Sequence, residues 1–145
     1  VILIAFLLPS PYNMTLPPTF MTFIVFAISL IISSILVTSI TMLYHLITFF
    51  TMDEKGIISF LMVFGEIFSG GTVPIVFFPK FMQFIAKLLP FQYICDLPFR
   101  IYSGNISINE SISVLIGGLI WSVVMIIFGY LLSRKALKNA SVQGG

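Results

Sequence analysis

The feature that most constrains this chain is a long apolar segment that glycines and prolines interrupt between Gly65 and Tyr102. Within it, Ser69-Gly70-Gly71-Thr72-Val73-Pro74 breaks a run apolar enough for a membrane, and prolines follow at Pro79, Pro90 and Pro98. Backbone groups freed by such breaks find no hydrogen-bond partner in lipid. Irregular backbone therefore occurs at membrane depth only inside protein or beside a water-filled cavity. This segment is the first candidate for function.

The composition is that of an integral membrane protein. Hydrophobic residues make up 59% of the 145 residues and charged residues only 8%, whereas a soluble domain carries about 25% charged residues. A chain of this length holds only a few spans of roughly 20 residues each. We therefore expect no separate catalytic domain, and any energy source must belong to another chain. The net charge of +2 is small and scattered, which argues against nucleic acid as a partner.

The apolar segments predict an all-α membrane domain with about three transmembrane helices and one short re-entrant or interfacial helix. A span needs about 20 apolar residues, and prolines mark the loops between spans. We expect the end of a truncated span at 1–8, spans at 19–51, 56–76 and 112–132, a hairpin at 79–102 and a tail at 133–145.

The hairpin contains an amphipathic helix between Pro79 and Pro90. Its apolar residues follow helical spacing, and its polar residues occupy the opposite face; they are Phe81, Phe84, Ile85 and Leu88 against Lys80, Gln83 and Lys87. The helix is too short to span. We expect it to lie in the membrane interface or to dip in and return, with Lys80 and Lys87 reaching the headgroups.

Two segments have the Ser/Thr-x-x-Glu spacing of a capping box, Thr51 to Glu54 and Ser107 to Glu110, and each predicts a helix start. The span after the second carries small residues for close helix contact, namely Gly117, Gly118 and Gly129. Three cations follow this span directly: Arg134, Lys135 and Lys138. The positive-inside rule then favours a cytoplasmic C-terminus in a multi-pass protein of the cell membrane. The hairpin would face outward.

Besides the two lysines of the amphipathic helix, the apolar segment contains Glu66, Asp96 and Arg100, which raise separate questions. Glu66 is inside a predicted span, where a carboxylate must face protein or water. Asp96 and Arg100 are i, i+4 partners only if the chain is helical across Pro98, a geometry that proline disfavours. Their pairing stays open at this point.

The sequence has no pattern typical of catalysis or metal binding. It lacks the Gly-x-x-x-x-Gly-Lys-Ser/Thr phosphate loop. It also lacks a Ser/His/acid set, a Cys/His pair and a His-x-x-x-His pair. We therefore predict no catalytic residue, no metal site and no cofactor in this chain.

An ordered series of motifs carries a family resemblance. In chain order the motifs are Ser69 to Pro74, Phe77-Phe78-Pro79, Leu89-Pro90-Phe91, Pro98 to Gly104 and Val142-Gln143-Gly144-Gly145. Together they resemble the C-terminal half of bacterial permease subunits of type-2 ABC exporters, over about residues 20–145.

The resemblance implies a permease of six spans, of which this chain supplies the end of the third and all of the last three. It also implies an outward-facing re-entrant hairpin, a separate ABC ATPase that binds ATP-Mg on the cytoplasmic face, and a second permease subunit, identical or different. The main coupling helix of that family precedes Val1. Secondary ATPase-side contacts are then expected at Asp53, Glu54, Lys55, Arg134, Lys135 and Lys138. For the basic tail, a role as topology determinant in contact with lipid phosphates is an alternative of at least equal weight.

The predicted site is an outer gate. Its break comprises Glu66, Ser69, Gly70, Gly71 and Pro74, and its outer hairpin comprises Pro79, Lys80, Lys87, Pro90, Asp96, Pro98 and Arg100. Glu66 either belongs to the transport path or packs against a neighbouring helix. Two alternative functions stay open: an ion-coupled secondary carrier in which Glu66 carries a proton, and a membrane scaffold or sensor without flux. A lipid, a peptide or an amphipathic drug would suit the apolar helices equally as substrate.

Overall fold

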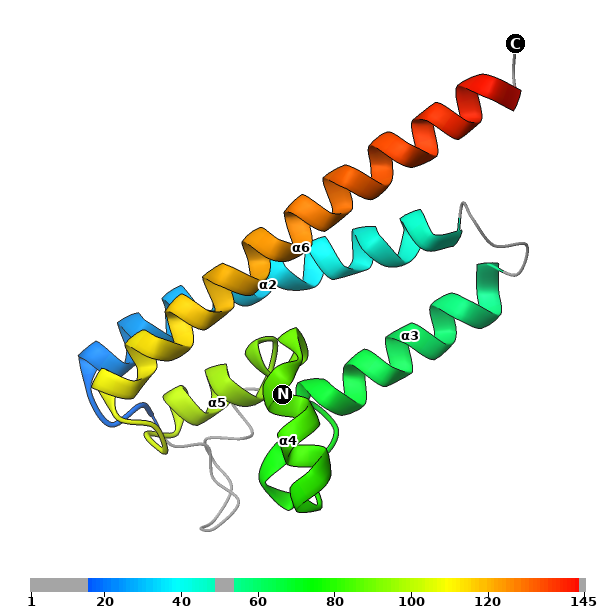
Figure 1. Ribbon diagram of the computed structural model, residues 1–145. Coiled ribbons are helices and arrows are strands. Elements are labelled where there is room, and N and C mark those ends of the chain that lie inside the picture. The colour runs from blue at the N-terminus through cyan, green and yellow to red at the C-terminus, as the bar shows by residue number, and fades with distance from the viewer. Residues whose placement is uncertain (1–15, 49–53, 144–145) are drawn as a thin grey trace.

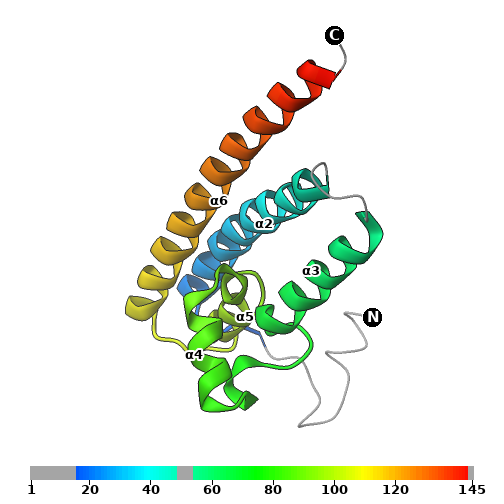
Figure 2. The ribbon, with the colours of Figure 1, turned by 45° about the vertical axis from the view of Figure 1, so that its right-hand side comes forward.

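Every regular element in the computed structural model, which describes residues 16–48 and 54–143, is a helix (Figures 1 and 2). This confirms the all-α prediction. The elements are α2 (Phe20–Thr48), α3 (Glu54–Ser69), η1 (Ile75–Phe77), α4 (Lys80–Leu88), η2 (Pro90–Tyr93), α5 (Asp96–Tyr102) and α6 (Ile108–Gln143). The two longest, α2 and α6, pack side by side, and the short helices gather beside them near the ends where α2 and α6 begin.

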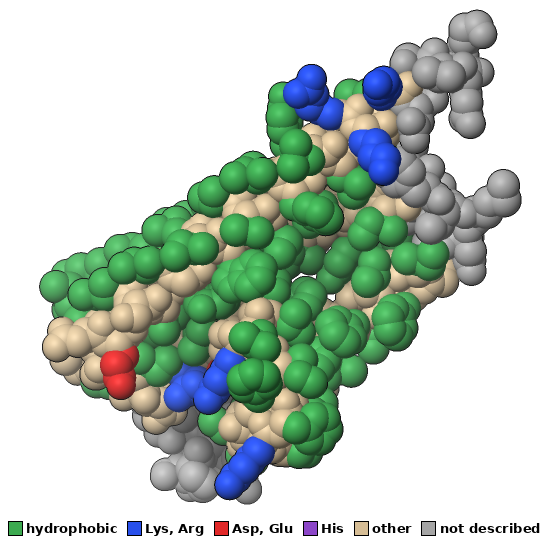
Figure 3. Space-filling model, viewed as in Figure 1, with side chains coloured by type: hydrophobic (Ala, Val, Ile, Leu, Met, Phe, Trp, Pro, Cys, Tyr) green, Lys and Arg blue, Asp and Glu red, His purple; other side chains and the backbone are tan. Residues whose placement is uncertain are grey.

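Helices α2 and α6 each contain a segment long and apolar enough to cross a membrane, Phe20–Ile47 and Ile108–Lys138. The buried face of α2 follows helical spacing and comprises Val25, Ile32, Leu36, Ile40 and Leu43. The buried positions of α6 are small, at Ser111, Gly118, Ser122 and Gly129, so the two backbones approach closely. Many apolar side chains of both helices are exposed, as the face in Figure 3 shows, which suits contact with lipid.

Helix α3 ends at Ser69 and is shorter than the predicted span at 56–76. Its 16 residues measure about 24 Å, less than the hydrocarbon core of roughly 30 Å. The helix ends there because Gly70 adopts a left-handed φ of 77°, the usual conformation just past a helix C-terminus. Pro74 then prevents the helix from resuming. The break predicted from the Gly-Gly-Thr-Val-Pro sequence is therefore present, but it begins before the apolar run is complete.

The short elements after the break surround a small apolar cluster. Phe68, Ile75 and Ala86 form its buried centre, and Phe64, Phe78, Met82, Leu89 and Phe91 pack against them. Helix α4 has the bounds that its two flanking prolines predicted. Helix α5 passes through Pro98 because this proline lies in the first turn, where its missing N–H needs no partner within the helix.

Helix α6 begins with the capping box that its sequence predicted. The Ser107 N–H donates to Glu110 Oε2 at 3.1 Å, and the Glu110 N–H donates to Ser107 Oγ at 3.3 Å. The helix continues to Gln143, so most of the predicted tail at 133–145 extends the last span as helix. Arg134 to Lys138 are mostly strong helix formers, which explains the extension. The Thr51 capping box extends outside the described residues.

Candidate functional site

Asp96 connects the chain after the α3 break to helix α5. Its side chain is only 4% exposed, and its Oδ1 accepts a hydrogen bond from the Ile75 N–H at 3.1 Å. Its Oδ2 lies 3.7 Å from Arg100 Nη1, so the i, i+4 pair that the sequence left open does form. A buried carboxylate needs such partners. The carboxylate thereby fixes the position of η1 relative to α5.

Gly70 contacts Asp96 so closely that no side chain fits. A Cβ on Gly70 would lie 2.7 Å from Asp96 Cβ, and the positive φ of Gly70 disfavours any other residue. Gly71 differs from it. A Cβ on Gly71 would lie 3.3 Å from Ser69 Oγ and 3.5 Å from Cys95 Sγ, which are side-chain atoms that can adjust. Of these two positions, only position 70 has a backbone conformation and surroundings that require glycine.

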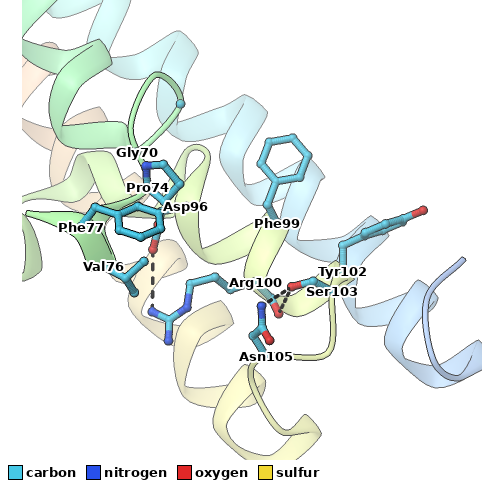
Figure 4. A pocket seen from close by; sticks show the side chains of 11 residues that line it. Gly70, Pro74, Val76, Phe77, Asp96, Phe99, Arg100, Tyr102, Ser103 and Asn105 are labelled. Carbon is cyan, nitrogen blue, oxygen red and sulfur yellow. Dashed lines mark hydrogen bonds and ion pairs between the residues drawn. The ribbon is translucent and has the colours of Figure 1, made fainter. Parts of the chain in front are cut away.

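A cavity of about 740 Å³ opens beside this junction (Figure 4). Its volume is typical of pockets for small ligands. The predicted site residues that line it are Gly70, Gly71, Pro74, Asp96 and Arg100; residues outside the predicted site add Val76, Phe77, Phe99, Tyr102, Ser103 and Asn105. Figure 4 shows the Arg100 side chain extending toward Asp96, with Val76 and Phe77 nearby. Most of the added residues lie in the motifs at Phe77 to Pro79 and Pro98 to Gly104, which could have indicated them.

Glu66 and Ser69 line a different pocket, of about 210 Å³, between α2 and α3. Glu66 is exposed, and its Oε1 accepts a hydrogen bond from Thr72 Oγ1 at 3.1 Å. Tyr44 and Phe91 also line this pocket. The structure therefore divides the predicted gate residues into two groups, with Glu66 and Ser69 on one side of the break and Gly70, Gly71 and Pro74 on the other.

The hairpin also packs against both long helices through η2. Ser33 Oγ of α2 donates a hydrogen bond to the Tyr93 carbonyl oxygen at 2.7 Å. On the α6 side, a Cβ on Gly117 would lie 2.5 Å from Tyr93 Oη. Two of the α6 glycines thus serve the close packing that their size predicted, with Tyr93 as a shared neighbour of Gly117 and Gly118.

The remaining residues of the predicted hairpin do not line the cavity. Pro79 precedes α4, Pro90 and Pro98 are buried, and Lys80 and Lys87 are exposed on α4. Cys95 lies next to Asp96 and is partly buried. Burial, and secondarily the negative charge of Asp96, raise the pKa of the Cys95 thiol. Its thiolate is therefore scarce at neutral pH.

The predicted ATPase-side residues either lie far from the cavity or fall outside the part of the chain that the structure describes. Arg134, Lys135 and Lys138 are exposed near the C-terminal end of α6, and Arg134 lies 5.8 Å from the centre of the Tyr130 ring. In Figure 3 the basic side chains at that end are separated from those near the hairpin. Asp53 lies outside the described residues, as do the side chains of Glu54 and Lys55. Among the described residues, no group of three or more His, Cys, Asp or Glu could hold a metal ion.

Comparison with known proteins gave one match. A family model described as ABC-2 family transporter protein matches residues 1–144. Neither the curated proteins nor the solved structures gave a match. The match covers the break, the hairpin and both long helices.

Proposed function

The chain belongs to the ABC-2 family of transporter proteins, and we propose that it forms part of the substrate path and the outer gate of an ATP-driven exporter. Family membership makes it a membrane permease of ABC type and a transport component, not itself a catalyst. The proposal adds that a separate ABC ATPase subunit binds and hydrolyses ATP-Mg. It also adds that a second permease subunit, identical or different, completes the path and that the C-terminus faces the cytoplasm.

The single observation that carries the gate proposal is the contact between Gly70 and Asp96. Gly70 ends α3 in a conformation that glycine alone adopts readily. Asp96 holds the next segment through the Ile75 N–H. A helix that breaks beside a cavity supplies both a hinge and backbone groups that can rearrange. The break and the hairpin 79–102 are therefore the elements best suited to open and close the cavity.

The energy needed to break the hydrogen bond between Asp96 and the Ile75 N–H is modest. A hydrogen bond to a charged group contributes about 1.5–3 kcal/mol, and only one such bond joins Asp96 to Ile75. Breaking it would free the Ile75 N–H from Asp96 while the Ile75 side chain stays in the apolar cluster. In the proposed cycle, closure of the ATPase on ATP supplies this energy, and the cavity beside Arg100 becomes the exit of the substrate path.

The gate is tested by two matched substitutions in the full-length subunit, reconstituted with its ATPase in liposomes. Gly70→Ala adds a Cβ beside Asp96 and forces a left-handed conformation that costs about 1–2 kcal/mol. Gly71→Ala adds the same atom at a site that can adjust. We expect Gly70→Ala to lose most of the ATP-driven transport and Gly71→Ala to keep it. Unchanged transport by a correctly inserted Gly70→Ala subunit would refute the gate.

The transport reaction is tested separately, with a fluorescent phospholipid, a short peptide and an amphipathic dye as candidate substrates. We expect an ABC ATPase to co-purify with the full-length subunit and at least one candidate to stimulate ATP hydrolysis in lipid. Transport that persists without the ATPase, collapses with the proton gradient and disappears in Glu66→Gln would instead identify an ion-coupled carrier. A complex without flux of any candidate and without an ATPase would identify a scaffold or sensor.

A further inference from the structure

Helix α4 has three faces with different surroundings. Its inner face packs on the apolar cluster through Ala86, which is fully buried. Its outer face exposes large apolar side chains, with Phe81 66%, Phe84 64% and Leu88 59% exposed. Between these two faces, Lys80 and Lys87 are both exposed. The fold therefore leaves a large part of the apolar surface of this helix exposed.

The two lysines lie on the same side of α4, seven residues apart, which corresponds to about 10 Å along the axis. The acids whose side chains the structure describes have other partners. Asp96 is buried beside Arg100, Glu66 binds Thr72, and Glu110 binds Ser107. No ion pair to Lys80 or Lys87 occurs among the described side chains. The positive charge on this side of the helix is therefore not neutralised there.

The position of α4 in the fold is consistent with the surface of a membrane. The helix packs against η1 and η2, on the side of the molecule where the α2 and α6 spans begin and away from the C-terminal end of α6 (Figures 1 and 2). An amphipathic helix at this level inserts its apolar residues at the boundary between headgroups and acyl chains, and lysines beside them attract anionic lipids. A protein partner would instead have to supply carboxylates at both lysines and cover three large apolar side chains.

We propose that α4 is a binding site for anionic phospholipids, which goes beyond the transport role. Lys80 and Lys87 bind headgroup phosphates, and Phe81, Phe84 and Leu88 pack against the acyl chains of the same leaflet. The anionic headgroup is favoured over a zwitterionic one because it brings net negative charge to the two ammonium groups. The two ammonium groups are expected to enrich anionic lipid beside α4 relative to the rest of the leaflet.

A fluorescent label on the outer face of α4 tests this proposal. The full-length subunit, assembled with its partners, carries Cys95→Ser and a bimane label on Phe84→Cys, in liposomes of phosphatidylcholine and phosphatidylglycerol. Spin-labelled phosphatidylglycerol should quench the label more strongly than spin-labelled phosphatidylcholine. A label on Ile120→Cys, which is exposed in the middle of α6, should be quenched equally by both lipids. This control separates local enrichment from a general preference of the liposome.

The lysines are tested in the same labelled subunit. The double variant Lys80→Gln/Lys87→Gln should bring the ratio of quenching by the two lipids at position 84 close to one, whereas Lys80→Arg/Lys87→Arg should keep it. Equal quenching by both lipids with the native lysines present would overturn the proposal. So would quenching by aqueous iodide alone, which would place α4 in water, or protection from every quencher, which would place a protein over it.

Discussion

The packing of Tyr93 against α6 predicts that Gly117→Ala destabilises the subunit although alanine is the better helix former. A Cβ at position 117 would lie 2.5 Å from Tyr93 Oη and 2.9 Å from both Cε1 and Cζ, so the ring must move. Such overpacking costs about 1–3 kcal/mol, and the gain in helix propensity returns about 1 kcal/mol. We expect a net loss of up to about 2 kcal/mol in the free energy of unfolding.

Gly129→Ala is the matched control because Gly129 is buried in the same helix. A Cβ there would lie 3.8 Å from Leu43 Cδ2, which is an ordinary contact, so this variant should keep the gain of about 1 kcal/mol. Unfolding of the full-length subunit is followed by circular dichroism during titration with dodecyl sulfate in mixed micelles. The two variants should differ by about 1–3 kcal/mol.

A double-mutant cycle locates the cause of this difference. Tyr93→Phe removes the atom nearest to the added Cβ, so Gly117→Ala should cost less in a Tyr93→Phe background than alone. A coupling free energy of about 0.5 kcal/mol or more is expected for residues in contact. Equal stability of Gly117→Ala and Gly129→Ala, or additive effects of Gly117→Ala and Tyr93→Phe, would refute a clash between the added Cβ and the Tyr93 ring.

Three further predictions follow from the same region. Because the pKa of the Cys95 thiol is raised by burial and then by Asp96, iodoacetamide should alkylate Cys95 more slowly than a free thiol at pH 7. The rate should climb only as the pH passes the raised pKa, and the same midpoint as a model thiol would contradict this. Asp96→Leu leaves the buried Ile75 N–H without an acceptor and should cost about 1–3 kcal/mol in the dodecyl sulfate titration. Asp96→Asn keeps an acceptor and should cost less; equal losses would show that the bond to Ile75 contributes nothing. Ser107→Ala removes the α6 cap and should cost about 1 kcal/mol, whereas Ser107→Thr should be close to neutral, and amide exchange at the start of α6 provides the measurement.

The sequence predicted the local elements well because local residues determine them. Prolines at 79 and 90 set the limits of α4, and the Ser107 capping box marks the start of α6. It predicted the bounds of the long apolar helices less well. Hydropathy alone carried the predicted span on to residue 76, whereas the left-handed Gly70 ends α3 at Ser69. Charge alone marked residues 133–138 as tail, although their helix propensity continues α6.

The candidate site could not be predicted in full, because it is formed by contacts between residues far apart in the sequence. The sequence indicated a break at the Gly-Gly pair, but only the packing against Asp96 shows that Gly70 is the residue that must be glycine. The bond from Ile75 to Asp96 joins residues 21 positions apart. Glu66 and Gly70 are close in sequence, yet the turn between them directs them into different pockets. Proximity along the chain is a poor guide to shared surroundings at a helix end.

The unbroken course of α6 has a mechanical consequence for the hairpin. Its 36 residues form a rod about 54 Å long, with no proline within it. Tyr93 rests against Gly117 near one end, and the basic residues occupy the other. A tilt of about 5° around the Gln143 end would displace Gly117, about 39 Å away along the axis, by about 3 Å. Because α6 is one continuous helix between these two points, any tilt of it at the basic end would also move the Gly117 surface on which Tyr93 rests.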